Sequence, residues 1–235
     1  MEISINGGKT VYAFIQARMN SQRLPGKVMK PLAGKSLLEW SLERAGMIHR
    51  DVRVVVITGS IEANRPIIEW CGKNGVECFV GSEEDVLNRF RRAADSYDAS
   101  DVIRLTADNP LFDYDAARAL LAVHLTENAE YSSNKSEVGS GLPDGIGVEI
   151  FSAETLAKLD GMSLSRSDRE HVNDYILGHP DEFERCYWLT IPQDCSAYRF
   201  TIDTREDFEQ VLDWISGHHT EDVRMPDYWR KIVRQ

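Results

Sequence analysis

The chain of 235 residues is long enough for one sizeable α/β domain, and its content of 42% hydrophobic and 28% charged residues is ordinary for a folded soluble protein. Its formal net charge of −11 argues against a general nucleic-acid binder, because contacts along a phosphate backbone need a basic surface. Four cysteines without C-x-x-C spacing give no disulfide framework, and no run of about 18 apolar residues predicts a membrane span. The N-terminus lacks a basic leader followed by an apolar stretch, so we expect one cytoplasmic domain over residues 1–235.

The first half of the chain alternates short apolar strands with amphipathic helices. The predicted strands cover residues 10–16, 52–58, 76–80 and 101–106. Apolar residues at helical spacing predict helices after Ser36, over 61–73, over 86–97 and after Asp113. This alternation favours a doubly wound, largely parallel α/β sheet, whose ligand site lies beyond the carboxyl ends of the strands.

From residue 130 the alternation breaks, and we interpret approximately residues 130–200 as an inserted α+β excursion. A Gly/Ser-rich stretch leads into a predicted strand over 148–151; helices over 153–159 and 168–177 and strands over 183–191 and 199–202 follow. Thr204 is then the predicted cap of a last helix. Tyr228 and Trp229, near the end of the chain, need cover from this subunit or from another.

A long loop with three cations follows the first predicted strand. It reads Ala17-Arg18-Met19-Asn20-Ser21-Gln22-Arg23-Leu24-Pro25-Gly26-Lys27 and leaves the sheet at the expected ligand edge. Arginine forks, a lysine charge and backbone N–H groups together suit a triphosphate. The loop is neither G-x-G-x-x-G nor Walker A, so a dinucleotide cofactor and a P-loop are excluded, and a merely solvated surface loop remains the alternative.

Two aspartates follow predicted strands at the same edge. Asp108 comes after the strand over 101–106, and Asp203 after the strand over 199–202. Mg²⁺ prefers one or two carboxylates together with phosphate oxygens and water, so this pair suits a metal. Each aspartate taken alone is equally an ordinary turn or cap residue.

The segment 15–38 resembles the opening signature of the cytidylyltransferases. That group includes the 3-deoxy-manno-octulosonate and N-acylneuraminate enzymes, and the resemblance is greatest to the spore coat polysaccharide biosynthesis protein F family. It continues in the family's order through GSEEDVL (81–87), TADNP (106–110), PDG (143–145), VEIF (148–151), REHV (169–172) and IDT (202–204). Asn20 stands where the family often has glycine, a turn that asparagine tolerates, and Thr201 where some acylneuraminate enzymes have a second aspartate.

The resemblance implies a Rossmann-like nucleotide-diphospho-sugar transferase architecture. It also implies Mg²⁺-dependent transfer of CMP from CTP to an acidic, 2-keto, sialic-acid-like sugar, with release of pyrophosphate, for surface polysaccharide or glycan synthesis. CTP and a small acidic sugar are the expected ligands, and the 130–200 region is expected to bind sugar and form a homodimer. A sugar-1-phosphate nucleotidyltransferase and a nucleotide-binding module without turnover are the alternatives.

The resemblance also implies roles for individual residues. The nucleotide contacts it implies are Ala17, Arg18, Ser21, Arg23, Lys27, Gly81, Ser82, Asp85 and Arg89. Arg18, Lys27 and Asp108 are expected to act in catalysis, with Asp108 and Asp203 as the metal ligands. The residues expected to face the sugar are Glu149, Arg169, Glu170 and His171, where an arginine is a natural partner for a carboxylate. As an exposed loop residue, Lys27 is expected to matter for turnover more than for stability.

Overall fold

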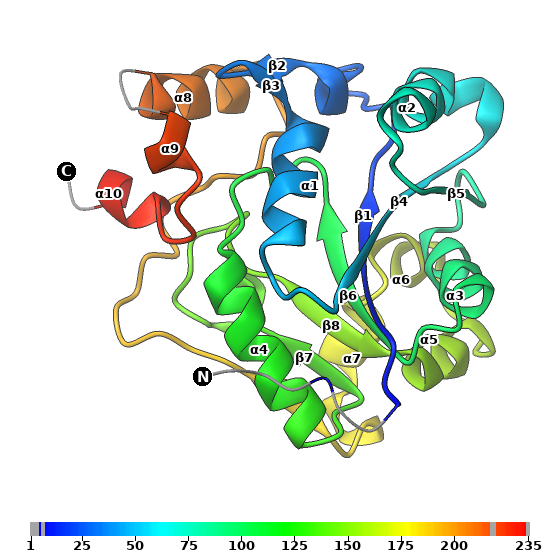
Figure 1. Cartoon of the computed structure of the whole chain (residues 1–235). Helices are drawn as coiled ribbons and strands as arrows, with labels where there is room; N and C mark the ends of the chain where they lie inside the picture. Colours follow the sequence, from blue (N-terminus) through cyan, green and yellow to red (C-terminus); the bar gives the residue numbers. More distant parts are fainter. Residues whose placement is uncertain (1–4, 6–7, 217–219, 234–235) are drawn as a thin grey trace.

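The computed structural model describes residue 5 and residues 8–216 and 220–233; the other residues of the predicted domain over 1–235 lie outside the described residues. A seven-stranded sheet forms the centre, in the order β5-β4-β1-β6-β8-β7-β9 (Figure 1). The four strands from the first half of the chain run parallel: β1 (Val11–Gln16), β4 (Arg53–Thr58), β5 (Cys78–Val80) and β6 (Asp101–Thr106). They coincide with the four strands predicted for the first half, and the largely parallel α/β sheet is confirmed.

Helices cover both faces of the sheet because side chains alternate along each strand. Val11, Ala13 and Ile15 of β1 belong to one apolar cluster, and Tyr12 and Phe14 to another. The first face is covered by α1 (Leu37–Gly46), α2 (Ile61–Asn74) and α4 (Tyr114–Thr126). The second is covered by α3 (Val86–Ser96), α5 (Ala153–Asp160) and α7 (Asp174–Gly178), with α6 (Arg166–His171) packed on α3 (Figure 1). The sheet is therefore doubly wound.

Capping side chains begin three of the helices where the sequence predicts. Ser36 forms a capping box at the start of α1, and Thr204 forms another at the start of α8 (Arg205–Ile215). Asp113 accepts the N–H groups of Asp115 and Ala116 at the start of α4. These caps fix the direction in which the chain turns from the edge of the sheet into each helix.

The predicted insertion extends the same sheet. β8 (Glu149–Ser152) pairs antiparallel with both β6 and β7 (Tyr131–Ser133), and β9 (Cys186–Trp188) pairs parallel with β7. β7 has no counterpart among the predicted strands, and the strand predicted over 183–191 is reduced to the three residues of β9. Short 3₁₀ helices lie at Lys27–Met29, Ser136–Val138 and Pro180–Glu182.

Two local predictions are wrong. The helix predicted over 168–177 is two helices, because Val172 has a φ of 70° and ends α6. The strand predicted over 199–202 is an extended segment with only an isolated bridge between Arg199 and Asp144. Asn20 does not have a positive φ; Gly26, with a φ of 68°, supplies the left-handed turn of the first loop.

The C-terminal segment covers its own aromatic residues. Tyr228 and Trp229 are buried in a third apolar cluster that also holds Trp40 and Phe200. The buried Arg44 donates to the carbonyls of Phe112, Val223, Met225 and Pro226, and burial lowers its pKa to about 10.

The remaining elements are the hairpin β2 (Pro31–Leu32) and β3 (Lys35–Ser36), α9 (Thr220–Val223) and α10 (Trp229–Val233). Within the described ranges, no helix has the length and apolar character needed to cross a membrane.

Candidate active site

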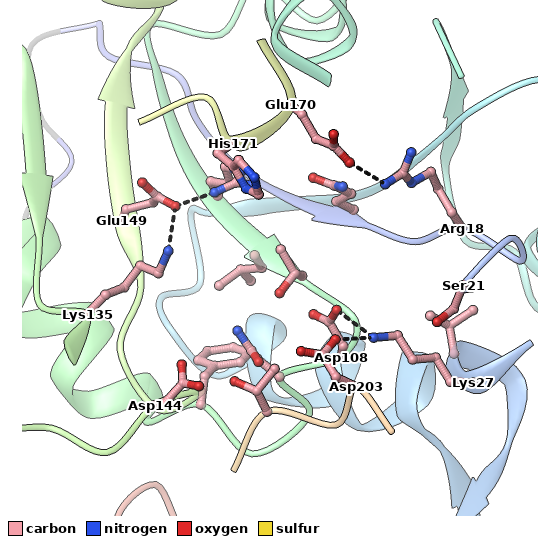
Figure 2. Close-up of a pocket in the computed structure, with 18 of the residues that line it drawn as sticks. Arg18, Ser21, Lys27, Asp108, Lys135, Asp144, Glu149, Glu170, His171 and Asp203 are labelled. Atoms are coloured by element: carbon pink, nitrogen blue, oxygen red, sulfur yellow. Dashed lines mark hydrogen bonds and ion pairs between the residues drawn. The ribbon is translucent and has the colours of Figure 1, made fainter. Parts of the chain in front are cut away.

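A cavity of about 970 Å³ opens at the carboxyl ends of the parallel strands, at the edge predicted for the ligand. Its wall is built by the loop after β1, the end of β6, residues between 135 and 149, α6, and the extended segment over 199–203. Figure 2 shows Lys27 pointing at Asp108 and Asp203 on one side of this cavity, with Glu149, Glu170 and His171 on the other. Segments far apart in the sequence thus share one polar hollow.

Lys27 is the centre of the first side. Its Nζ lies 2.9 Å from Asp108 Oδ2, from Asp203 Oδ1 and from the carbonyl oxygen of Ile202. The Lys27 side chain is only 8% exposed, so the expectation of an exposed loop lysine is wrong. Removing it would leave two neighbouring carboxylates without their shared cation, and stability is therefore linked to this residue as well.

Asp108 and Asp203 converge on one point. Burial favours the neutral acid of Asp108, but the Lys27 ammonium and hydrogen bonds hold the pKa of Asp108 below its ordinary value. Within the described part of the chain, no group of three or more His, Cys, Asp or Glu side chains is arranged to hold a metal. Two convergent carboxylates do fit a Mg²⁺ ion that keeps its remaining ligands from phosphate and water.

The loop after β1 is folded around Met19. The Met19 carbonyl accepts the N–H groups of Ser21 at 3.0 Å and Gly26 at 2.9 Å, and its own N–H donates to the buried Asn64 at 2.9 Å. This fold places Arg18, Ser21, Arg23 and Lys27 in the cavity wall. Three cations and a hydroxyl therefore lie along one wall, as a polyanionic ligand requires.

Glu149 organises the opposite end of the cavity. It is buried, accepts a hydrogen bond from Tyr131 at 2.7 Å, and pairs with Arg104 and with Lys135, whose Nζ is 3.3 Å away. Burial favours neutral Glu149, but Lys135 and Arg104 hold the pKa of this carboxyl below its ordinary value. Glu137 lies 3.0 Å from Lys135, so this end is a network of paired charges.

A sequence model of the cytidylyltransferase family matches residues 12–223. The chain belongs to the cytidylyltransferase family. It is 36% identical over 204 residues to the spore coat polysaccharide biosynthesis protein SpsF of Bacillus subtilis, covering 84% of this chain and 82% of that protein. The solved structure of a cytidylyltransferase from Leptospira borgpetersenii has a TM-score of 0.88 and 31% identity, and the match covers 96% of this chain and 94% of that one.

The fold is also shared with CMP:2-keto-3-deoxy-manno-octonic acid synthetase, solved in complex with CTP. That match has a TM-score of 0.67 and 16% identity and covers 90% of this chain and all of that chain (100%). The resemblance to cytidylyltransferases and the expected nucleotidyltransferase architecture are thus confirmed.

Not all the nucleotide residues predicted for this cytidylyltransferase line the cavity. Ala17 is buried beside β4, and Gly81, Ser82, Asp85 and Arg89 lie outside the wall. Arg89 is fully buried and donates to the Ser82 carbonyl; burial, followed by the charge of Arg18, lowers its pKa to about 10. A Cβ added to Gly81 would lie 2.8 Å from Arg89 Cγ, so this glycine makes room for the arginine.

The residues predicted to face the sugar are also divided. Glu149, Glu170 and His171 line the cavity. Arg169 does not, because its Nε is 2.7 Å from Asp85 Oδ2 and its Nη2 pairs with Asp160. Arg169 thus ties α6 to the start of α3 and the end of α5, and its sugar contact stays a prediction.

Sequence reasoning missed several charged residues of the cavity, namely Arg104, Lys135, Glu137, Asp144 and Arg199. Arg104 had a visible signal, because it is the one charge inside the run Val102–Thr106 of a central strand. Asp144 lies in the PDG motif, which the resemblance singled out without a role. Lys135, Glu137 and Arg199 lie in segments without regular periodicity and carried no comparable signal.

Glu149→Gln is expected to lower the free energy of unfolding by about 2–3 kcal/mol at pH 7, because a neutral amide leaves the charges of Arg104 and Lys135 poorly compensated. The pKa of Glu149 is lower in the folded chain than in the unfolded chain. Its stabilising effect is therefore present above the unfolded pKa of about 4.3 and is lost as the pH falls through the folded value. Urea unfolding of both proteins between pH 7 and pH 3.5 measures this. A difference that stays constant down to the lowest pH would contradict it.

Proposed function

We propose that this cytidylyltransferase acts in the cytoplasm and transfers CMP from CTP to an acidic 2-keto sugar, releasing pyrophosphate, for a surface polysaccharide or another glycan. The observation that carries the proposal is the meeting of Lys27, Asp108 and Asp203 at one point of a cavity that is large enough for a nucleotide and a sugar. The names of similar proteins support its direction: one acts in spore coat polysaccharide biosynthesis, and another is a synthetase of a CMP-linked 2-keto sugar acid.

Arg18, Arg23 and Lys27 are the proposed triphosphate ligands. A sugar hydroxyl attacks the α-phosphorus: a new O–P bond forms, the hydroxyl proton is released to solvent, and the bond to the bridging oxygen of pyrophosphate breaks on the opposite side. Lys27 stabilises the charge that develops on the α-phosphate oxygens. Asp108 and Asp203 would hold Mg²⁺, which neutralises phosphate charge when bound. The protein thus contributes position and charge rather than a covalent intermediate.

The acidic acceptor is proposed for the Glu149 end of the cavity. Arg104 lines this end, only one of its guanidinium nitrogens, Nη1, pairs with Glu149, and its buried Nε has no hydrogen-bond partner among the described residues. His171 adds a further polar group, and Glu170, also in the cavity wall, lies 3.8 Å from Arg18. A carboxylate of the acceptor could complete the hydrogen bonds of this arginine.

A pyrophosphate-release assay tests the proposal directly. The purified chain is incubated with Mg²⁺ and each of the four nucleoside triphosphates, together with 2-keto sugar acids, matched neutral sugars or sugar 1-phosphates. Pyrophosphate is expected only with CTP and a 2-keto sugar acid, with the CMP-sugar identified by mass spectrometry. Lys27→Ala protein prepared identically controls for a contaminating transferase.

The other outcomes separate the alternatives. Turnover of sugar 1-phosphates would make the protein a sugar-1-phosphate nucleotidyltransferase. Calorimetric binding of CTP without turnover of any acceptor would make it a binding module.

A homodimer is proposed at the free edge of β9. This strand is the last of the sheet, and Trp188 on it is 40% exposed. An unpaired strand edge with an exposed aromatic residue favours association. Sedimentation equilibrium of the wild-type chain and Trp188→Ser measures it, and a wild-type monomer at micromolar concentration would refute it.

Arg169→Ala is expected to cost about 1 kcal/mol of stability, since its two partly exposed ion pairs are lost, and to change the acceptor KM by less than about threefold. Urea unfolding and steady-state kinetics measure the two effects. Arg205→Ala is the control, because Arg205 lies outside the cavity wall and its pair with Glu209 is exposed. A tenfold rise of the acceptor KM in Arg169→Ala alone would restore the predicted sugar contact.

A further inference from the structure

Arg199 joins three aspartates at the rim of the cavity. Its Nη1 lies 2.7 Å from Asp144 Oδ2, its Nη2 lies 2.7 Å from Asp203 Oδ2, and its Nε lies 3.5 Å from Asp207 Oδ1. Each nitrogen of the guanidinium therefore faces a different carboxylate. An arginine engaged in this way holds protein groups in place and has little capacity left for a ligand.

Residues 199–202 do not form a strand, so the backbone before Asp203 is not fixed by sheet pairing and needs other contacts to position it. Two backbone hydrogen bonds fix this segment: Phe200 donates to the Asp144 carbonyl at 2.7 Å, and Ile202 donates to the Asp108 carbonyl at 2.8 Å. Gly145, with a φ of 86°, permits the close approach, since a Cβ there would lie 2.5 Å from the Thr201 nitrogen. The backbone is thus positioned by the PDG motif and by Asp108, but these contacts leave the Asp203 side chain free to rotate.

The direction of the Asp203 carboxylate is set by its cations. Oδ2 is held by Arg199 and by Arg23, whose Nη2 is 3.0 Å away, and Oδ1 faces Lys27. Arg23 is 62% exposed and belongs to the proposed triphosphate ligands, so its contact with Asp203 competes with phosphate. Arg199 is not among the proposed triphosphate ligands, and by holding Oδ2 it keeps Oδ1 turned toward Lys27.

We propose that Arg199, held by Asp144, is a positioning residue that fixes Asp203 for the divalent cation bound with the triphosphate. The inference rests on the proposed function, in which Asp203 is a metal ligand. It gives the PDG motif a role: Asp144 and Gly145 together place Arg199 and, through it, the second metal carboxylate. Partners that orient metal ligands commonly affect affinity or activity by about 10- to 100-fold.

Binding of Mn²⁺ to the complex of the full chain with CTP, without acceptor, tests the proposal by electron paramagnetic resonance. Arg199→Ala is expected to weaken Mn²⁺ about tenfold and to lower kcat, with the KM for CTP little changed at saturating metal. Arg199→Lys is expected to recover part of the affinity, and Asp144→Asn to show a smaller loss. Arg205→Ala is the control, because Arg205 lies nearby but pairs with Glu209 at an exposed site, and it should bind Mn²⁺ as the wild type does.

The possible results separate a failure of the positioning role of Arg199 from a failure of the proposed function. Tighter Mn²⁺ binding by Arg199→Ala would mean that the arginine acts only as a repelling charge, and unchanged binding would mean that it acts only in folding; either result overturns the positioning role. If Arg199→Ala fails to fold by circular dichroism, Arg199→Lys and Asp144→Asn decide the question in the same measurement. A wild-type chain that binds neither CTP nor Mn²⁺ refutes the proposed function itself.

Discussion

Replacing Lys27 with alanine is expected to lower kcat by roughly 10³-fold, about 4 kcal/mol of transition-state stabilisation. The reason is geometric: the ammonium lies 2.9 Å from both proposed metal ligands and belongs to the loop proposed to hold the triphosphate. Steady-state kinetics with CTP, Mg²⁺ and the acceptor found in the pyrophosphate assay measure the effect. Lys30→Ala is the control, since Lys30 is in the same segment but outside the cavity wall.

The same variant should also lose stability, because Asp108 and Asp203 would face each other without the buried ammonium. We expect a loss of about 1–3 kcal/mol in urea unfolding. A folded Lys27→Ala protein with wild-type turnover would show that the phosphates bind elsewhere. A protein with lost turnover and full stability would show instead that the two carboxylates relax into solvent.

Asp108→Asn is expected to lower kcat by a similar factor, roughly 10³-fold, and to cost less stability than Lys27→Ala, because Asp203 still pairs with the Lys27 ammonium. The amide keeps the shape of the side chain but removes the charge that pairs with Lys27 and suits a divalent cation. Titrating Mg²⁺ at saturating CTP measures both the maximal rate and the concentration for half-maximal activity, which should rise. Asp115→Asn, at an exposed pair with Arg118 in α4, is the matched control. Wild-type activity of Asp108→Asn at ordinary Mg²⁺ would remove this aspartate from the site.

The parts of the fold that were predictable are those with strong local signals. β1, β4 and β6 are each six residues long and rich in apolar and β-branched residues, and Ser36, Asp113 and Thr204 are capping residues in front of amphipathic helices. β7 is three residues long and two of them are serines, so it forms a strand through its pairing with β8 and β9 rather than through local propensity. The strand predicted over 199–202 is wrong although its local sequence favours a strand. Phe200 and Ile202 are β-prone and buried, but their backbone N–H groups pair with Asp144 and Asp108 rather than with a neighbouring strand.

The residues of the candidate site were predictable where their place at the end of a strand determines their location in the fold. Asp108 follows a central strand and Lys27 belongs to the first crossover loop, so topology alone brings them to one edge. The ion pairs of Arg169 with Asp85 and Asp160 could not be predicted, because the partners of an arginine depend on the fold. The burial of Lys27 could not be read from the loop, since it comes from carboxylates 81 and 176 residues away.

Arg44 makes the end of the chain part of the same structural unit as α1. Three of the four carbonyls that receive its hydrogen bonds come from the C-terminal segment, and the fourth belongs to Phe112, a few residues beyond Asp108. In a homologue that lacked this segment, the buried guanidinium would lose three hydrogen-bond acceptors. An uncompensated buried charge strongly lowers the free energy of unfolding. We therefore expect the C-terminal segment and Arg44 to have evolved together. Homologues with a shortened C-terminus should carry a neutral side chain at the position of Arg44 in α1.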